Sequence, residues 1–291
     1  MTQTAFDPRI LTAEIVLQDN SKIYAGPLYI KATGSKTIIS QQNTCTVTIG
    51  NMQKSERDYI MSNCNQNLQA QYKIRRIKIM AGRESVQSWQ VFEGDIINAS
   101  LTQPPDIMLN LRCATNARDR TQWATWSNLT NVTLGNLAQQ VATLMGLTLQ
   151  LDASVNANYV IPRFTFNGPA AALIIRLSEL GGPAATDGTN GGVRVWVDDT
   201  VLHVANWKTG LSNTKVNVSA ATGMVGIPEY TEYGIKVKTL ADRNIVLGGG
   251  MTLNSVMVPA MNADYVITRL DYDLSTRSQE FYYDVWANRS G

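Results

Sequence analysis

The side chains that could do acid–base chemistry are few and scattered along the sequence. His203 is the only histidine among the 291 residues. It alternates with Val201 in an apolar run, which is typical of a structural histidine on a strand. Asp198 and Asp199 are adjacent, and aspartates commonly form backbone hydrogen bonds in turns. We therefore expect a hairpin that turns at these two residues, with metal binding as the minor alternative.

Two glutamates, Glu229 and Glu232, are flanked by Tyr230 and Tyr233 in the stretch GIPEYTEYGIKVKTL, residues 226–240. Glycosidases use two carboxylates that flank the bond to be cleaved. Nothing in the sequence places a partner for either glutamate across a cleft, so no enzyme is predicted. A cell-wall hydrolase that uses Glu229 or Glu232 stays the less favoured alternative.

The cysteines exclude the usual zinc sites and indicate a reducing compartment. Cys45, Cys64 and Cys113 are widely separated, and no pair has the Cys-x-x-Cys spacing. The first twenty residues lack a basic segment followed by a long apolar one, so no secretory signal is predicted. No apolar run approaches the roughly 18 residues of a membrane span. We expect reduced cysteines, no cofactor, no membrane span and synthesis in a cytoplasm.

The charge of the chain does not favour a nucleic-acid partner. Lys and Arg total 25 against 23 Asp and Glu, a net charge of +2, so no strong field attracts polyanions. The densest basic run places Lys73, Arg75, Arg76 and Lys78 among isoleucines, without an aromatic residue on which a base could stack. We interpret this run as a strand with one charged face.

Alternation of polar and apolar residues predicts antiparallel strands in the first hundred residues and again after Lys215. Between the early strands, a helix is predicted over 54–65, with Ser55 as its N-cap and Glu56 and Asp58 in its first turn. The expected strands cover 13–18, 28–36, 44–52, 73–82, 88–96, 106–113, 215–220, 234–240, 244–255, 264–275 and 280–288.

The middle of the chain has a helical period instead. Over 131–146, Thr133 is expected to cap a helix that Gly146 ends, and a second helix over 167–182 starts near Pro169 and ends before Gly181. A glycine-rich loop, residues 181–192, follows and is expected to be flexible. We predict a mainly β protein with a small α+β unit, in three domains: 1–112, 113–207 and 208–291. The apolar stripes of the two helices are Leu134, Leu137, Ala138, Val141, Leu144 and Met145, and Leu173, Leu177 and Leu180.

The strand predicted over 234–240 is typical of a barrel strand with an inner core face. Ile235 and Val237 share one face, and Lys236 and Lys238 share the other. Pro228 is expected to set the turn that leads into this strand.

Three stretches resemble a known family: CTVTIGNMQKSERDYI; IKIMAG with QVFEGDIINASLTQPPDIMLNLRC; and GIPEYTEYGIKVKTL with NIVLGGGMTL and YVITRLDYDLSTRSQEFYYDVW. Together they are similar to the baseplate hub proteins of contractile-tailed bacteriophages, which are related to phage late-control D proteins and to the spike-bearing hubs of contractile secretion systems. The resemblance implies two tail-tube-like antiparallel β-barrels joined by a small central domain.

The resemblance also implies partners and a place. A homotrimer would match its six barrels to a hexameric tail tube protein and its threefold axis to a trimeric spike protein. It would continue the lumen through which the tape measure protein and DNA pass, in contact with other baseplate proteins. Such a hub is part of the virion tail baseplate and is assembled in the host bacterial cytoplasm, and we expect the piercing tip on another chain. Candidate subunit-interface residues are Glu229, Tyr230 and Tyr233.

One alternative of a different class stays open. Trp123, Trp126, Tyr230 and Tyr233 could form an aromatic surface that binds glycan or peptidoglycan, because such side chains combine an apolar body with a polar group. The same side chains also anchor protein interfaces.

Overall fold

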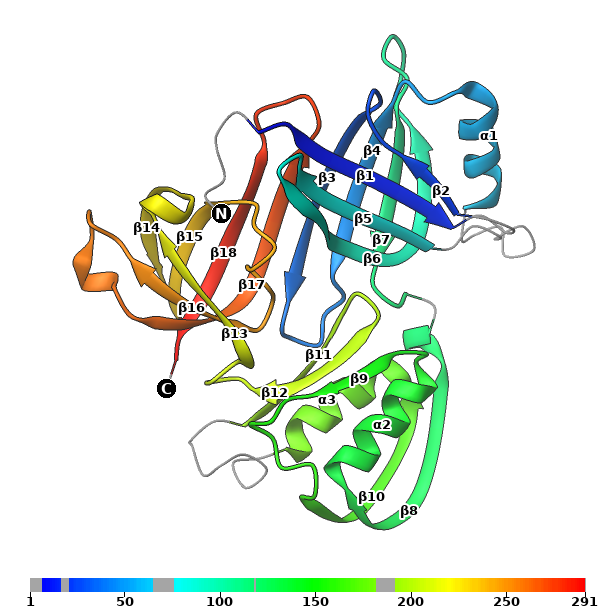
Figure 1. Cartoon of the computed structure of the whole chain (residues 1–291). Helices are drawn as coiled ribbons and strands as arrows, with labels where there is room; N and C mark the ends of the chain where they lie inside the picture. The colour runs from blue at the N-terminus through cyan, green and yellow to red at the C-terminus, as the bar shows by residue number, and fades with distance from the viewer. Residues whose placement is uncertain (1–6, 17–20, 65–75, 118, 182–191, 291) are drawn as a thin grey trace. The chain divides into compact units, whose positions relative to one another are not determined.

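The computed structural model describes residues 7–16, 21–64, 76–117, 119–181 and 192–290. It is mainly β, and the described residues contain three short α-helices. Figure 1 labels its helices and strands. The chain divides into two compact units: unit 1 comprises Met1–Ser35, Asn43–Ala117 and Asp271–Tyr282, and unit 2 comprises Lys36–Gln42, Arg118–Leu270 and Tyr283–Gly291.

Unit 1 is built on one antiparallel sheet. Its strands follow the spatial order β17, β3, β4, β7, β6, β5, β1, β2, and every ladder with a defined register in it is antiparallel. β17 and β18 continue into unit 2. The bounds are β1 Arg9–Val16, β2 Ser21–Tyr24, β3 Tyr29–Thr37, β4 Thr44–Gly50, β5 Arg76–Arg83, β6 Val86–Leu101, β7 Leu109–Ala114, β17 Asp264–Ser275 and β18 Phe281–Arg289.

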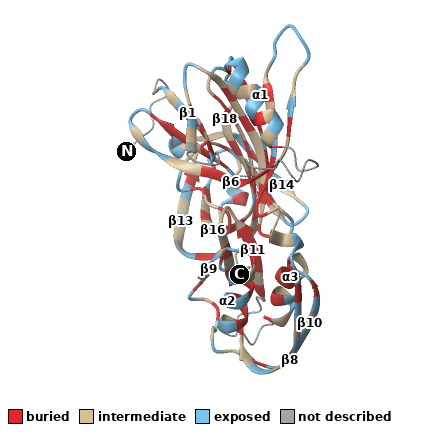
Figure 2. Cartoon of the chain, turned by 90° about the vertical axis from the view of Figure 1, so that its right-hand side faces the viewer, coloured by how far each residue is buried: buried red, intermediate tan, exposed pale blue. Residues whose placement is uncertain are grey.

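The alternation in the sequence places the core of unit 1. Buried residues alternate with more exposed ones along β1 and β18, because successive strand side chains point to opposite faces. Figure 2 shows the buried residues of the chain in red. In the described part of the basic run, Ile77 is buried and Arg76 exposed, which confirms a strand with a charged face; Lys73 and Arg75 lie outside the described residues. The most deeply buried side chains include Leu11, Ala13, Ile15, Val47, Ile49, Ile77, Ile79, Leu109 and Leu111.

The sheet of unit 1 curls so that its two ends meet through side chains. Arg9, on β1, donates a hydrogen bond from Nη1 to the carbonyl oxygen of Ser278 at 2.8 Å. The guanidinium carbons of Arg9 and Arg83 lie 5.3 and 5.6 Å from the ring centre of Phe281. No backbone ladder joins these ends among the residues that the structure describes. The prediction of a mainly β fold is confirmed, whereas closed barrels are not observed there.

The helix of unit 1, α1 (Lys54–Asn63), begins differently from the prediction. Its N-cap is Gln53, and no side chain caps it. Ser55 therefore lies in the first turn and is not the cap. The helix buries Ile60. The three cysteines of this unit are free and buried.

The first part of unit 2 is the small α+β unit. β8 (Trp123–Thr133) pairs antiparallel with β10 (Val160–Pro169). Helices α2 (Leu134–Leu144) and α3 (Ala170–Leu180) pack on the sheet of β9 (Thr148–Leu151), β12 (Val201–Asn206) and β11 (Val193–Asp198). β9 and β12 are parallel. The shared core comprises the helical stripes together with Val195, Val197, Leu202 and Val204.

Local signals place these two helices as predicted. Thr133 accepts a hydrogen bond from the backbone N–H of Asn136 at 3.3 Å, and Gly146 follows α2 with a φ of 63°. Pro169 precedes α3 and Gly181 ends it. Most of the predicted 181–192 loop lies outside the described residues.

The remaining strands of unit 2 belong to the same 13-stranded sheet: β14, β15, β18 and β17 follow one another in it, and β16 pairs with β17 and with β13. β13 and β16 pair in parallel, although all these strands were predicted to be antiparallel. Alternation does not reveal this difference, because a strand buries the same face in either direction. The bounds are β13 Leu211–Ser219, β14 Met224–Thr231, β15 Gly234–Leu240 and β16 Gly249–Asn254, and short 3₁₀ segments cover Asp119–Thr121, Ala220–Thr222 and Pro259–Met261.

Pro228 lies inside β14 and is buried, so the prediction that it forms a turn before β15 is wrong. The β14–β15 register shifts between Val225 and Glu229, and such an irregularity tolerates a residue without an N–H.

The three predicted domains stay a prediction. Among the described residues, no helix is both long and apolar enough to cross a membrane.

Candidate functional site

The candidate interface residues lie on the β14–β15 hairpin. Glu229 pairs with Lys236 and Tyr230 with Ile235, and residues 232–233 form the turn. Ile235 and Val237 are each 1% exposed, which confirms the inner face predicted for this strand. A Cβ at Gly234 would collide with the carbonyl oxygen of Ala287, so the hairpin turn sits directly against β18.

The tyrosines of the hairpin face solvent. Tyr230 is 67% exposed and Tyr233 is 75% exposed, and Ile227 on the same strand is 54% exposed. Exposed apolar groups clustered on one element are typical of an interaction surface. Their role at a subunit interface stays a prediction.

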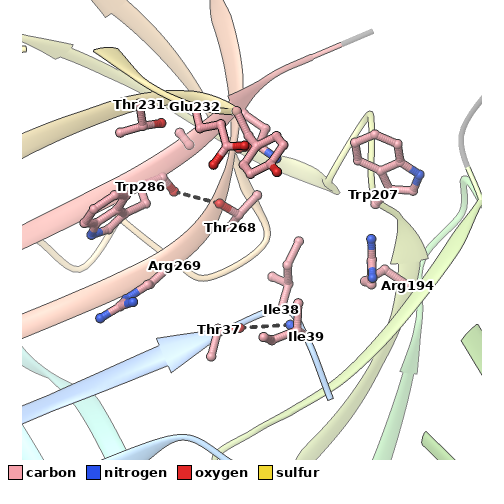
Figure 3. Close-up of a pocket in the computed structure, with 13 residues that line it drawn as sticks. Thr37, Ile38, Ile39, Arg194, Trp207, Thr231, Glu232, Thr268, Arg269 and Trp286 are labelled. Atoms are coloured by element: carbon pink, nitrogen blue, oxygen red, sulfur yellow. Dashed lines mark hydrogen bonds between the residues drawn. The ribbon is translucent and has the colours of Figure 1, made fainter. Parts of the chain in front are cut away.

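A pocket of about 430 Å³ opens beside this turn, and we call it the β15 pocket. Figure 3 shows its lining side chains, which come from the end of β14 and the hairpin turn, from β17 and β18, from β11, from the residue after β12, and from the segment 37–39. All of these residues belong to unit 2. They are Thr37, Ile38, Ile39, Arg194, Trp207, Thr231, Glu232, Tyr233, Thr268, Arg269, Trp286, Ala287 and Asn288.

Hydrogen bonds hold one wall of the pocket in place. The backbone N–H of Ile38 donates to the carbonyl oxygen of Thr268 at 3.0 Å, and the Thr268 hydroxyl donates to the carbonyl oxygen of Trp286 at 3.2 Å. The backbone N–H of Ile39 donates to the Thr37 hydroxyl at 3.0 Å (Figure 3). The wall made by 37–39 is therefore fastened to β17.

Two cations lie over the indole ring of Trp286. The Lys236 ammonium lies 5.3 Å from a Trp286 ring centre and the Arg269 guanidinium carbon 5.5 Å, distances at which the ring attracts a cation. Lys236 also forms an ion pair with Asp284 at 3.6 Å. Two buried donor atoms on the pocket wall, Nε1 of Trp286 and Nε of Arg194, have no hydrogen-bond partner.

A buried ion triad anchors the segment that carries Ile38 and Ile39. Lys36 Nζ lies 2.8 Å from Asp198 Oδ1 and 3.0 Å from Asp199 Oδ1. Burial alone would lower the pKa of Lys36, but the two carboxylates outweigh it and hold that pKa above its usual value. The aspartates lie at the β11–β12 turn as predicted, and they pair there with a lysine that is distant in sequence.

His203 packs as a structural residue beside this triad. Its ring stacks on that of Trp196, with the centres 5.1 Å apart and the planes at 10°. Burial lowers the pKa of His203 to about 4, assisted by the charge of Lys36 and opposed by that of Asp199. The imidazole is therefore neutral at pH 7, which supports the interpretation that it is structural.

The aromatic residues proposed for glycan binding do not share one environment. Trp123 is 67% exposed and donates a hydrogen bond from Nε1 to Asn167 Oδ1 at 2.7 Å. Trp126 packs against the α+β core, with its ring centre 6.1 Å from that of Phe164. Trp126 is only partly buried there, and glycan binding stays an alternative prediction.

The structure assembles groups that sequence reasoning missed. Lys36, Arg194, Trp207 and Trp286 received no role from the sequence, because each stands in an ordinary strand or loop pattern. For Arg194, Trp207 and Trp286 the only available signal is the residue type, since Trp and Arg are enriched at binding surfaces; Lys36 has no such signal. In the part of the chain that the structure describes, no cluster of three or more His, Cys, Asp or Glu side chains could hold a metal ion.

A model of the family described as baseplate hub gp41 matches residues 10–287 of this chain. No curated protein matches the sequence. Two solved tail proteins, the 43 kDa tail protein of prophage MuSo2 from Shewanella oneidensis and a tail protein from Neisseria meningitidis, each share the fold with a TM-score of 0.63 at 9% identity, over 97% of both chains.

A third solved structure extends the likeness to a secretion system. The Escherichia coli c3393 protein, a type VI secretion component described as similar to the T4 tail proteins gp27 and gp5, has a TM-score of 0.58 at 10% identity. That match covers 91% of this chain and 74% of the other. At 9–10% identity, these matches show a similar fold only.

Proposed function

Because the chain belongs to the baseplate hub gp41 family, whose model matches residues 10–287, we propose that it forms the homotrimeric hub that joins a hexameric tail tube to a trimeric spike. The family is structural and non-enzymatic, and the chain is a component of a phage tail baseplate. The family match over nearly the whole chain is the observation that carries the proposal.

The proposed hub uses two tube-like barrels in each subunit, joined by the small α+β unit, in the domains 1–112, 113–207 and 208–291. Three subunits then supply six barrels to the tube and one threefold axis to the spike. The curl of the unit 1 sheet, with Arg9 and Arg83 against Phe281, supports a barrel there. The ring continues the lumen for the tape measure protein and DNA, and it assembles in the host cytoplasm with other baseplate proteins.

Two exposed apolar features of unit 2 support assembly through this unit. One is the hairpin surface with Glu229, Tyr230 and Tyr233. The other is a loop tip at which Val256 is 87% exposed and Met257 is 72% exposed. A closed ring would bury such groups, because each subunit meets a neighbour on two sides.

The loop tip is held in a defined conformation. The Ser255 N–H donates to Asn262 Oδ1 at 2.7 Å, and the Val258 N–H donates to the Ser255 hydroxyl at 3.2 Å. The Tyr265 hydroxyl donates to the carbonyl oxygen of Met261 at 2.6 Å. The tip therefore presents its two apolar side chains from an ordered frame, which lowers the entropy cost of binding.

Native mass measurement tests the proposal directly. We expect a trimer of the full chain that caps the ends of assembled tail tubes in electron micrographs and binds a trimeric spike protein. A chain that stays monomeric at all concentrations and salt conditions, with no affinity for tube or spike, would refute the hub role. Retention on cell-wall material without tube binding would favour the glycan-binding alternative.

A further inference from the structure

The β15 pocket is lined by both charged and aromatic side chains, a combination suited to binding a ligand. We propose that it binds an extended peptide segment that carries a carboxylate next to an apolar side chain. That the segment comes from another protein of the tail rests on the proposed function. The chemistry of the segment rests only on the pocket.

The size and walls of the pocket suit a short stretch of peptide. A volume of about 430 Å³ falls within the range of about 300–1,000 Å³ that is typical of ligand sites. Trp207 and Ile39 (Figure 3), together with Tyr233, supply apolar surface to the pocket lining. Trp and Tyr are also the residue types that dominate the energetics of protein recognition.

The charge of the pocket selects an anionic group. Its lining contains two guanidinium groups, those of Arg194 and Arg269, and one carboxylate, that of Glu232. Lys236 also lies beside Trp286, but its ion pair with Asp284 offsets its charge, so the excess positive charge of the pocket comes from the two arginines. Electrostatic complementarity therefore favours a negatively charged segment.

Arg194 carries a buried hydrogen-bond donor that has no acceptor. Its Nε is buried and makes no hydrogen bond, and a buried donor without a partner is costly, more so on a charged group. A carboxylate satisfies a guanidinium with two parallel hydrogen bonds. Nε1 of Trp286, which also lines the pocket, is a second buried donor without a hydrogen-bond partner.

Glu232 determines which way round a ligand with one carboxylate lies in the pocket. It comes from the hairpin turn and is exposed, whereas Arg194 comes from β11, and Figure 3 shows them on different walls of the pocket. A ligand carboxylate is repelled from the Glu232 side and attracted to the Arg194 side. The apolar side chain of the segment is then left to the tryptophans.

Methyl-resolved NMR of the intact protein labelled at isoleucine tests this site. The probes are acetyl-Phe-Asp-Phe-amide and acetyl-Phe-Asn-Phe-amide, which differ only in the carboxylate. We expect the Asp peptide to shift the Ile38 and Ile39 signals and to bind about tenfold more tightly than the Asn peptide, because charge-assisted hydrogen bonds are about twice as strong as neutral ones. The Ile10 and Ile107 signals should not move.

Three variants complete the test. Arg194→Gln should remove the tenfold preference, and Arg163→Gln, an exposed arginine on β10, should retain it. Ile39→Glu, at a site already 41% exposed, should block the Asp peptide, with Ile38 as the reporter. Unchanged distant isoleucine signals show that each variant is folded.

Equal binding of the two peptides, no shift with either, or a preference that survives Arg194→Gln would overturn the inference. The trimer mass of the same samples separates this failure from failure of the hub role. A trimer that binds tube ends but does not bind the Asp peptide would refute only the proposal that the pocket binds a peptide. A monomer that still binds the Asp peptide through Arg194 refutes only the hub.

Discussion

The ammonium of Lys36 lies within 3.0 Å of the carboxylates of both Asp198 and Asp199. The Lys36 side chain is 6% exposed, and the aspartates are 18% and 16% exposed. This triad joins the segment before Ile38 to the turn of a hairpin more than 160 residues later in the chain. It is the polar anchor of one wall of the β15 pocket.

Lys36→Met should destabilise the protein by about 3 kcal/mol, because removing one partner leaves the other buried charges uncompensated. Urea unfolding measures the change. Lys215→Met is the matched control, because its pair with Asp264 is 57% and 50% exposed, and exposed pairs contribute at most about 1 kcal/mol. Equal losses for the two variants would mean that the triad is not a buried anchor.

Stability should fall as the pH decreases from about 6.5 toward 4, in part through His203. Its folded pKa of about 4 lies below the value of about 6.5 in an unfolded chain, so the unfolded state binds more protons in this window. The slope from one such group reaches about 1.4 kcal/mol per pH unit. His203→Phe keeps a ring against Trp196 but does not titrate. Urea midpoints across this pH range should be flatter for the variant, and identical slopes would contradict the prediction.

Tyr230→Ala and Tyr233→Ala should each weaken trimer formation about tenfold or more, because exposed tyrosines at an interface centre are typical hot spots. Sedimentation equilibrium measures the change. Tyr59→Ala serves as the control, since Tyr59 lies on α1 and is 45% exposed. An unaffected trimer in both hairpin variants would leave these tyrosines as ordinary surface residues.

Gly34→Ala should destabilise unit 1 by about 3 kcal/mol, as overpacking of a filled site does. Its Cβ would collide with the backbone carbonyl oxygen of Thr44 and with the hydroxyl of Tyr272, and a backbone group cannot swing away. Gly250→Ala, also on a strand, is the control, since its nearest new contact is Lys215 Cγ at 3.5 Å. Thermal unfolding compares them, and similar midpoints would show that the β3–β4 contact can relax.

Local signals in the sequence predicted much of the fold. Thr133, Gly146 and Gly181 marked helix ends correctly, because capping and termination depend on neighbouring residues. The prediction of Ser55 as N-cap was also based on a local signal, and it was wrong because the N-cap of the helix is Gln53, without a side-chain cap. The turn predicted at Pro228 was wrong because a strand with a register shift can accommodate a proline.

The sequence by itself determined the strand faces, the two central helices, the structural character of His203 and the family. These depend on periodicity and residue type, which are local. Only the tertiary structure decided that β13 and β16 pair in parallel, that Lys36 meets Asp198 and Asp199, and that Arg194 and Trp286 line one pocket with Glu232 and Tyr233. Those relationships join residues far apart in the chain, and no local pattern records which distant strands will pack together.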